Sequence, residues 1–166
     1  MPRPRCFVVS YVMTIRVALP RDVPAIYNLL KGYAEKELLL SRSYSELYDC
    51  VRDFRVAEEE GRVIGTAALH VTWEGLAELR SLAVEEEFTG RGIGRNLAGA
   101  CLADAGAMGI GRVFVLTYVP EFFRKLGFRS ADKSELPHKV WGDCVKCVKF
   151  PDCDESALIW EKTGNG

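Results

Sequence analysis

A short segment rich in glycine and arginine is the part of the sequence best suited to chemistry. Residues 89–95 read TGRGIGR and lie between an apolar stretch and a helix-compatible one. Glycines lack the β-carbon that would keep backbone amides from closing around an anion, and amides at a helix N-terminus favour negative charge. The segment therefore predicts a cradle for a diphosphate group, formed by Gly90, Arg91, Gly92, Gly94 and Arg95.

Two familiar phosphate-binding patterns do not fit this segment. Its glycines alternate, and no acidic residue closes a following strand about twenty residues on, as the dinucleotide-binding pattern G-x-G-x-x-G requires. The Lys-Ser/Thr pair of a P-loop is also missing. Taken alone, the segment fits a flexible surface turn equally well. The neighbouring segments of the sequence have to distinguish a phosphate cradle from a surface turn.

The segments around this loop alternate between strand and helix patterns, which predicts an α/β (α+β) fold. Asp22 before Pro24 is typical of a helix N-cap, and Ser43 with Glu46 three residues later fits a capping box. The pattern predicts strands at 14–18, 54–58, 63–72, 76–84 and 113–118, and helices at 23–35, 44–52, 93–108 and 120–126.

The composition indicates one soluble domain that binds a small molecule. The 166 residues suffice for a single core, and they hold 22 Lys and Arg against 23 Asp and Glu. This balance argues against nucleic acid or an anionic membrane as the main partner. We expect an N-terminal extension at 1–13, a single domain at 14–160 and a tail at 161–166, in a cytoplasmic protein that forms a homodimer.

Two motifs resemble the GNAT superfamily of N-acetyltransferases. The pyrophosphate loop of that family reads Arg/Gln-x-x-Gly-x-Gly/Ala and follows a strand that ends in Ala-Val; here Thr89–Gly94 follows Ala83-Val84. Thr89 departs from the Arg or Gln of the family. Residues 122–128, FFRKLGF, resemble the family motif F-Y-x-K-x-G-F. Two motifs at this spacing make the resemblance specific.

Within the superfamily, the chain is most similar to the amino-acid acetyltransferase domain of N-acetylglutamate synthases, particularly their short bacterial form. The similarity runs from Ile15 to about Glu155. It rests on LLLSRS at 38–43, RDF at 52–54, FVLT at 114–117, LPHKVW at 136–141 and CDE at 153–155. It implies an acyltransferase that moves the acetyl group of acetyl-CoA to the α-amine of L-glutamate, in arginine biosynthesis.

The resemblance also implies where acetyl-CoA binds. The GNAT fold has a central mixed, mostly antiparallel sheet flanked by helices, and two strands, here 76–84 and 113–118, splay apart around the cofactor. The backbone would hydrogen-bond the pantetheine chain like an added strand, and the amide of Leu82 would polarise the thioester carbonyl. The expected cofactor contacts are Leu82, Ala83, Val84, Thr89, Gly90, Arg91, Gly92, Ile93, Gly94, Arg95 and Phe123.

Glu78 is the expected general base, because it begins the strand that faces the cofactor, where burial favours proton uptake by a carboxylate. The general acid is harder to assign. Many superfamily members carry a Tyr where this chain has Phe123, and a phenylalanine cannot donate a proton. Tyr118 is the nearest alternative along the sequence; solvent or the newly formed ammonium are others.

Substrate binding is expected from cationic and hydroxyl side chains. Guanidinium groups suit glutamate because they offer planar, two-point donors to carboxylates. Arg42 belongs to the LLLSRS segment, and Arg80 is a charge in an otherwise apolar strand. Thr117 offers a hydroxyl, and Lys139 a further positive charge. Arg52 is a weaker candidate, since it suits a solvated surface position equally well.

The cysteines near the C-terminus raise a metal alternative. The sequence holds one C-x-x-C pair rather than two, so the zinc pattern is incomplete, and no metal is expected. The candidate ligands of this alternative are His138, Cys144, Cys147 and Cys153. Two further functions stay open: acetyl transfer to another amino acid or small amine, and a non-catalytic sensor of acetyl-CoA or metal.

Overall fold

The centre of the molecule is one seven-stranded sheet. The computed structural model describes residues 12–137, 141–145 and 152–164. The strands lie in the order β1-β2-β3-β4-β5-β7-β6, and every pair is antiparallel except β4 with β5. Their bounds are β1 Thr14–Val17, β2 Phe54–Glu59, β3 Arg62–Trp73, β4 Leu76–Val84, β5 Arg112–Thr117, β6 Arg129–Ser130 and β7 Ser156–Glu161.

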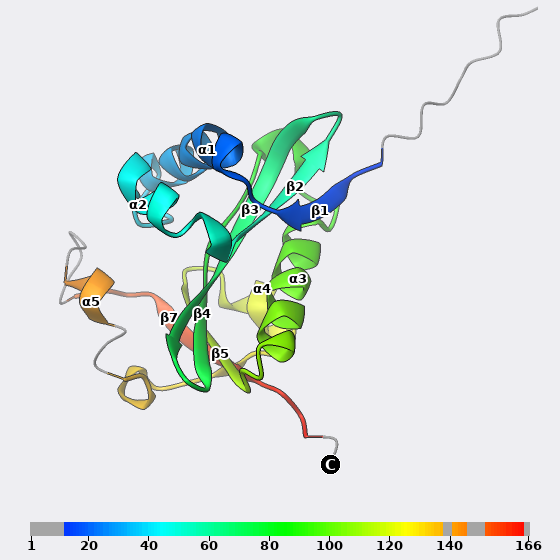
Figure 1. Ribbon diagram of the computed structural model, residues 1–166. Helices are drawn as coiled ribbons and strands as arrows, with labels where there is room; N and C mark the ends of the chain where they lie inside the picture. Colours follow the sequence, from blue (N-terminus) through cyan, green and yellow to red (C-terminus); the bar gives the residue numbers. More distant parts are fainter. Residues whose placement is uncertain (1–11, 138–140, 146–151, 165–166) are drawn as a thin grey trace, which may run out of the picture.

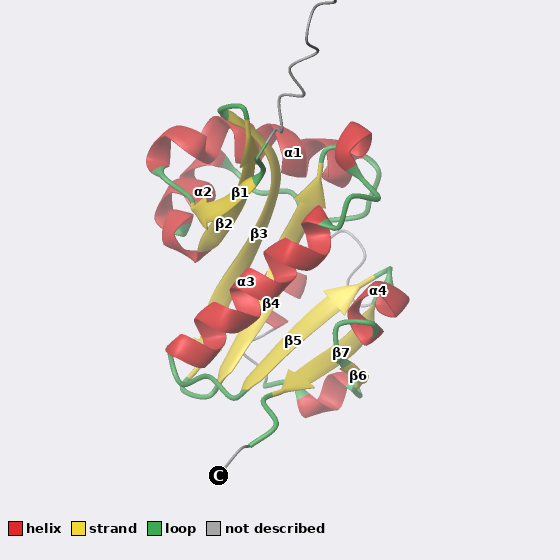
Figure 2. Cartoon of the chain, turned by 90° about the vertical axis from the view of Figure 1, so that its right-hand side faces the viewer, coloured by secondary structure: helices red, strands yellow, loops and turns green. Residues whose placement is uncertain are grey.

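Helices cover both faces of the sheet (Figure 1). One face carries α1 and α2, and the other carries α3 and α4 (Figure 2). The helices are α1 Val23–Glu35, α2 Tyr44–Asp49, α3 Ile93–Ala107, α4 Pro120–Arg124 and α5 Trp141–Cys144. This mixed, mostly antiparallel sheet between helices confirms the predicted fold class.

Local sequence signals place most element boundaries correctly. In the capping box before α2, the Glu46 amide donates to Ser43 Oγ at 3.2 Å and the Ser43 amide donates to Glu46 Oε2 at 2.8 Å. Asp22 does stand at the N-cap position of α1, but its carboxylate does not cap that helix. It accepts from the Leu19 amide at 2.7 Å and from Arg16 instead. A nearby guanidinium therefore diverts the expected capping group.

The sequence patterns did not predict the two strands that complete the sheet. β7 pairs with the whole length of β5, and the two-residue β6 pairs with β7. Trp160 lies in β7 and packs against the core on the α3 side. β7 ends at Glu161, one residue beyond the predicted domain boundary at 160/161. The boundary itself stays a prediction.

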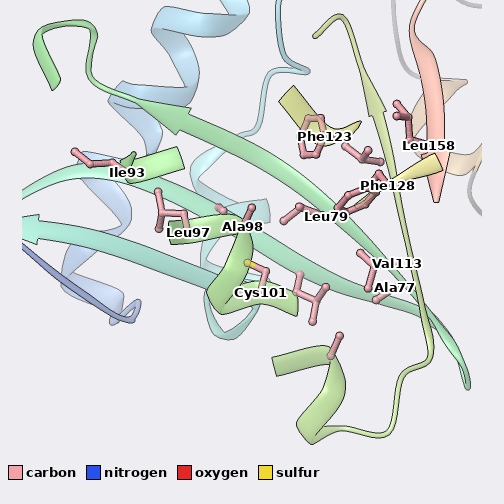
Figure 3. Close-up of a cluster of buried hydrophobic side chains, with 14 of the residues drawn as sticks. Ala77, Leu79, Ile93, Leu97, Ala98, Cys101, Val113, Phe123, Phe128 and Leu158 are labelled. Atoms are coloured by element: carbon pink, nitrogen blue, oxygen red, sulfur yellow. The ribbon is translucent and has the colours of Figure 1, made fainter. Parts of the chain in front are cut away.

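The main core lies between the sheet and α3 (Figure 3). Leu97 of α3 is fully buried and lies over Gly65 of β3, where a β-carbon would come within 3.0 Å of Leu97 Cδ1. Gly65 therefore lets the helix approach the sheet closely. This contact supports α3, whose first turn begins directly after the glycine-rich loop.

The buried Asp22 makes the stability of the fold depend on pH. Hydrogen bonds from Arg16, at 2.7 and 2.9 Å, are the main reason that the pKa of Asp22 lies below its ordinary value. A carboxyl whose pKa is lowered by folding stabilises the fold above its unfolded pKa, and this contribution is lost as pH falls through the folded pKa. We therefore expect the stability gap between the native protein and Asp22→Asn to shrink as pH falls below about 4. Urea unfolding midpoints from pH 7 to 3 measure the gap, and a gap that stays constant would contradict the argument.

Candidate functional site

The site begins where β4 and β5 part. The two strands pair in parallel only at Leu76↔Arg112, Ala77↔Val113 and Glu78↔Phe114, although β4 continues to Val84 and β5 to Thr117. Figure 2 shows the strands diverging towards their C-terminal ends. The predicted splay is therefore present. Among the described residues, no strand pairs with the edge of β4 beyond Glu78 on the β5 side.

A bulge in β4 lies beside this splay. Ser81 has a φ of 55°, which is uncommon for a residue with a β-carbon, and the register with β3 shifts between Thr66 and Ala68. An extra residue in one strand reverses the alternation of the side chains that follow. Arg80 and Ala83 therefore face α1 and α2, whereas Leu82 and Val84 pack on the α3 side.

The glycine-rich loop leads directly into α3. Gly90 and Gly92 have φ values of 78° and 79°, which favour glycine, and Gly92 is the N-cap residue of α3. Ile93 begins the helix and is buried, and Gly94 follows it in the first turn. The hydroxyl of Thr89 donates to the Glu86 carbonyl at 2.8 Å. The predicted loop thus stands at the N-terminus of a fifteen-residue helix.

The two arginines of the loop have different surroundings. Arg91 forms an ion pair with Glu59 of β2 at 2.7 Å, and its guanidinium lies 5.3 Å from the centre of the Phe88 ring. Hydrogen bonding from Arg91 lowers the pKa of Glu59 below its ordinary value. Arg95 is exposed in the first turn of α3. Arg91 therefore connects the loop to β2, while Arg95 keeps its charge at the surface.

Glu78 and Arg80 form a charged pair on the opposite face of β4 from the main core. Ala77 and Leu79 belong to the core under α3, so strand alternation directs Glu78 and Arg80 to the side of α1 and α2. Their side chains are 17% and 12% exposed, and Arg80 Nη1 lies 3.6 Å from Glu78 Oε2. The structure thus brings the predicted base and one predicted substrate arginine together.

Arg42 belongs to the same neighbourhood. The half-buried Cys50 follows α2, and burial raises the pKa of its thiol, with Asp53 acting in the same direction. The positive charges of Arg80 and Arg42 act in the opposite direction on this pKa. Two predicted substrate arginines from distant parts of the chain therefore both influence the thiol that follows α2.

The sequence interpretation missed a histidine beside this pair. His70 of β3 is the register partner of Glu78, and its Nδ1 lies 2.7 Å from Asp53 Oδ2. Cross-strand partners carry their side chains on the same face. A histidine in a mostly apolar strand was the available signal. Tyr33 of α1 was missed as well; its hydroxyl hydrogen-bonds the backbone of Val84.

The other predicted site residues lie apart from the charged pair. Thr117 is buried, and its Oγ1 accepts from the Val119 amide at 3.0 Å. Tyr118 follows it, four residues beyond the register partner of Glu78, roughly 13 Å along the strand direction. Phe123 is buried, with its ring centre 5.0 Å from that of Phe122. Lys139 lies outside the described residues.

The metal alternative falls partly outside the described residues, because His138 and Cys147 lie there. Cys153 Sγ lies 3.6 Å from Glu155 Oε2, and Cys144 is half-buried. Across residues 12–137, 141–145 and 152–164, no three His, Cys, Asp or Glu side chains are grouped as metal ligands. Within the same ranges, every helix is too short or too polar to cross a bilayer.

Comparison with known sequences gives consistent matches. The model of the acetyltransferase (GNAT) family matches residues 23–128. An uncharacterized N-acetyltransferase of Chlorobaculum tepidum is 41% identical over 145 residues, which are 87% of this chain and 94% of that protein. An amino-acid acetyltransferase of Mycobacterium tuberculosis is 39% identical over 135 residues, 80% of this chain and 77% of that protein.

Solved structures agree with the sequence matches. The Rv2747 protein of Mycobacterium tuberculosis, in complex with CoA and NLQ, superposes with a TM-score of 0.78 and 33% identity, over 90% of this chain and 99% of that one. N-acetylglutamate synthase of Neisseria gonorrhoeae, with CoA and N-acetyl-glutamate, gives a TM-score of 0.84 and 28% identity over 92% of this chain. The match spans only 36% of that synthase.

These matches confirm the predicted enzyme class, an acyltransferase with acetyl-CoA as co-substrate. They also confirm the resemblance inferred from the two motifs, since both motifs lie within residues 23–128. Because the family model covers more than half of the sequence and the relatives align over most of it, this chain belongs to the GNAT family of acetyltransferases.

Proposed function

We propose that the protein transfers the acetyl group of acetyl-CoA to the α-amine of L-glutamate. The observation that carries the proposal is the Glu78–Arg80 pair, two largely buried charges on β4 beside the splay, with Arg42 nearby. Guanidinium groups bind substrate carboxylates, and a carboxylate accepts the amine proton. Relatives named amino-acid acetyltransferase, and the complex of the gonococcal synthase with N-acetyl-glutamate, favour glutamate as the acceptor.

In this proposal acetyl-CoA lies in the splay. The backbone of residues 82–84 hydrogen-bonds the pantetheine chain along the edge of β4, and the Leu82 amide polarises the thioester carbonyl. The amides of residues 90–94 hold the pyrophosphate at the start of α3, where Arg95 adds charge. Arg91 contributes by leaving its ion pair with Glu59 and pairing with a phosphate of the cofactor instead. Thr89 shapes the turn before the loop, and Phe123 holds α4 against the core.

The reaction is a direct transfer. Glu78 takes a proton from the substrate ammonium, and the free amine attacks the thioester carbonyl carbon. The carbon–sulfur bond then breaks, and the thiolate leaves with its electron pair. Tyr118, which follows β5, protonates that thiolate, and the second proton, which the nitrogen loses as the amide forms, restores Tyr118 through solvent. Arg42 and Arg80 hold the two carboxylates of glutamate, assisted by Thr117 and Lys139.

The cellular setting follows from this chemistry and is part of the same proposal. N-acetylglutamate serves arginine biosynthesis, so the enzyme acts in the cytoplasm on a small-molecule substrate. We propose that it does so as a homodimer, the commonest assembly of soluble enzymes.

Removing Arg42 provides the test of the acceptor. We expect Arg42→Ala to raise the KM for glutamate by about 10- to 100-fold, because a charge-assisted hydrogen bond contributes about 1.5–3 kcal/mol. The KM for acetyl-CoA stays unchanged, since Arg42 belongs to the substrate side. Thiol release from acetyl-CoA, measured across a panel of amino acids, gives both constants.

Arg52→Ala is the matched control, because Arg52 is exposed and also carries a positive charge near α2. An equal rise in KM for both variants would mean that general positive charge, and not a specific contact, attracts glutamate. Turnover of another amine in place of glutamate would retain the enzyme class and discard the acceptor. Tight binding of acetyl-CoA without turnover of any amine would favour the alternative function, a non-catalytic sensor of acetyl-CoA.

A further inference from the structure

Tyr33 makes an unusual contact with the strand that borders the splay. Its hydroxyl donates to the Val84 carbonyl at 2.8 Å and accepts from the Val84 amide at 3.3 Å. Tyr33 belongs to the last turn of α1, while Val84 is the last residue of β4. One side-chain oxygen therefore satisfies both backbone groups of a single strand residue.

The direction of these backbone groups follows from the pairing with β3. The Glu85 amide donates to the Ile64 carbonyl at 2.8 Å, and Val84 is the register partner of Gly65. In an antiparallel ladder, hydrogen-bonded and non-hydrogen-bonded pairs alternate, so the amide and carbonyl of Val84 point away from β3. The neighbour of β4 on that side is β5.

At Val84 the pairing with β5 has already ended, because the last rung joins Glu78 and Phe114. The groups that Tyr33 engages therefore belong to the splayed edge of β4. Strand alternation predicts the same orientation for Leu82, two residues earlier. An extended chain carrying amides, such as pantetheine, pairs with a strand edge through such groups.

We propose that Tyr33 is a positioning residue of the cofactor site. It holds the backbone amide and carbonyl of Val84 in β4 and releases them to an amide of the pantetheine chain when the cofactor binds. The inference rests on the proposed placement of acetyl-CoA in the splay. Tyr33 keeps the amide and the carbonyl of Val84 paired in the free protein. Cofactor binding then exchanges one set of hydrogen bonds for another, so Tyr33 lowers the affinity while preserving the shape of the edge.

Removing only the hydroxyl tests this exchange. Tyr33→Phe leaves the Val84 groups to water in the free protein, so the pantetheine amide no longer competes with a side chain. We expect the Kd for CoA, measured by calorimetry, to fall about threefold to tenfold, the range that one net hydrogen bond allows. Tyr27→Phe is the matched control, because Tyr27 also belongs to α1 but stacks on Tyr44, and its Kd stays unchanged.

Two fragments of the cofactor locate the effect. Pantetheine should show the same gain with Tyr33→Phe, whereas adenosine 3′,5′-bisphosphate, which lacks the pantetheine amides, should bind both proteins equally. Tyr33→Leu, which also lacks the hydroxyl, guards against a folding defect in Tyr33→Phe and should bind CoA more tightly than the native protein.

Each contrary result has a distinct meaning. An unchanged or higher Kd for CoA in Tyr33→Phe would overturn the exchange, since Tyr33 would then be neutral or a direct ligand. A gain that appears equally with the bisphosphate would overturn the assignment to pantetheine. Failure of the native protein to bind CoA would instead overturn the proposed cofactor site, before any variant is compared.

Discussion

Glu78→Gln should lower kcat by about 10²–10⁴-fold, the range that a general base contributes. The amide keeps the shape of the side chain, but it cannot take the proton from the substrate ammonium. Glu78 lies on the last rung that joins β4 to β5, well before the glycine-rich loop. The KM for acetyl-CoA should therefore change little. Steady-state thiol release with saturating glutamate measures both constants.

A glutamate outside the site provides the control for this substitution. Glu74 is exposed in the turn between β3 and β4, so Glu74→Gln should leave kcat unchanged. Glu78→Asp retains a carboxylate at a greater distance and should have an intermediate rate. A kcat for Glu78→Gln within threefold of the native value would remove Glu78 as the base. His70, its register partner, would then be the first residue to replace.

Leu97→Ala should destabilise the fold by about 2–5 kcal/mol. Leu97 is fully buried in α3 and lies against Gly65, which has no side chain to move into the space that a truncated residue leaves. The variant therefore loses apolar contacts and retains a cavity. The same packing supports the helix that follows the glycine-rich loop, so CoA affinity should fall as well. Urea unfolding followed by circular dichroism gives the change in free energy.

Asn96→Ala is the control on the same helix. Asn96 is exposed, and alanine favours helix, so its free energy of unfolding should stay within about 0.5 kcal/mol of the native value. A loss below about 1 kcal/mol for Leu97→Ala would mean that α3 settles onto β3 without a cavity. Gly65 would then not limit the approach of the helix, contrary to the geometry of this contact.

Element boundaries that depend on local chemistry were predictable from the sequence. The strand predicted at 76–84 is β4 Leu76–Val84, and the helix predicted at 93–108 is α3 Ile93–Ala107. Glycine turns and capping residues act over a few positions, so their effect can be read directly. β7 was missed because its strand character depends on pairing with β5, which is distant in the sequence.

The candidate site was predictable only in part. Glu78, Arg80 and the glycine-rich loop were identifiable because their residue types are unusual at those positions. Their relation to Arg42 was not, because Arg42 lies in the loop before α2, and the place of that loop depends on how α1 packs on α2 and on the sheet. The contacts of His70 and Tyr33 join elements far apart in the chain and carry no motif.

The sequence by itself determined the family, the position of the glycine-rich loop before a helix and the order of most strands and helices, because these depend on residue types at short spacing. Only the tertiary structure decided which groups meet. It ends the pairing of β4 and β5 after Glu78 and Phe114, engages Arg91 with Glu59, and brings Tyr33 to the backbone of Val84. Such contacts depend on the packing of helices on a twisted, bulged sheet, and no short segment of the chain encodes that geometry.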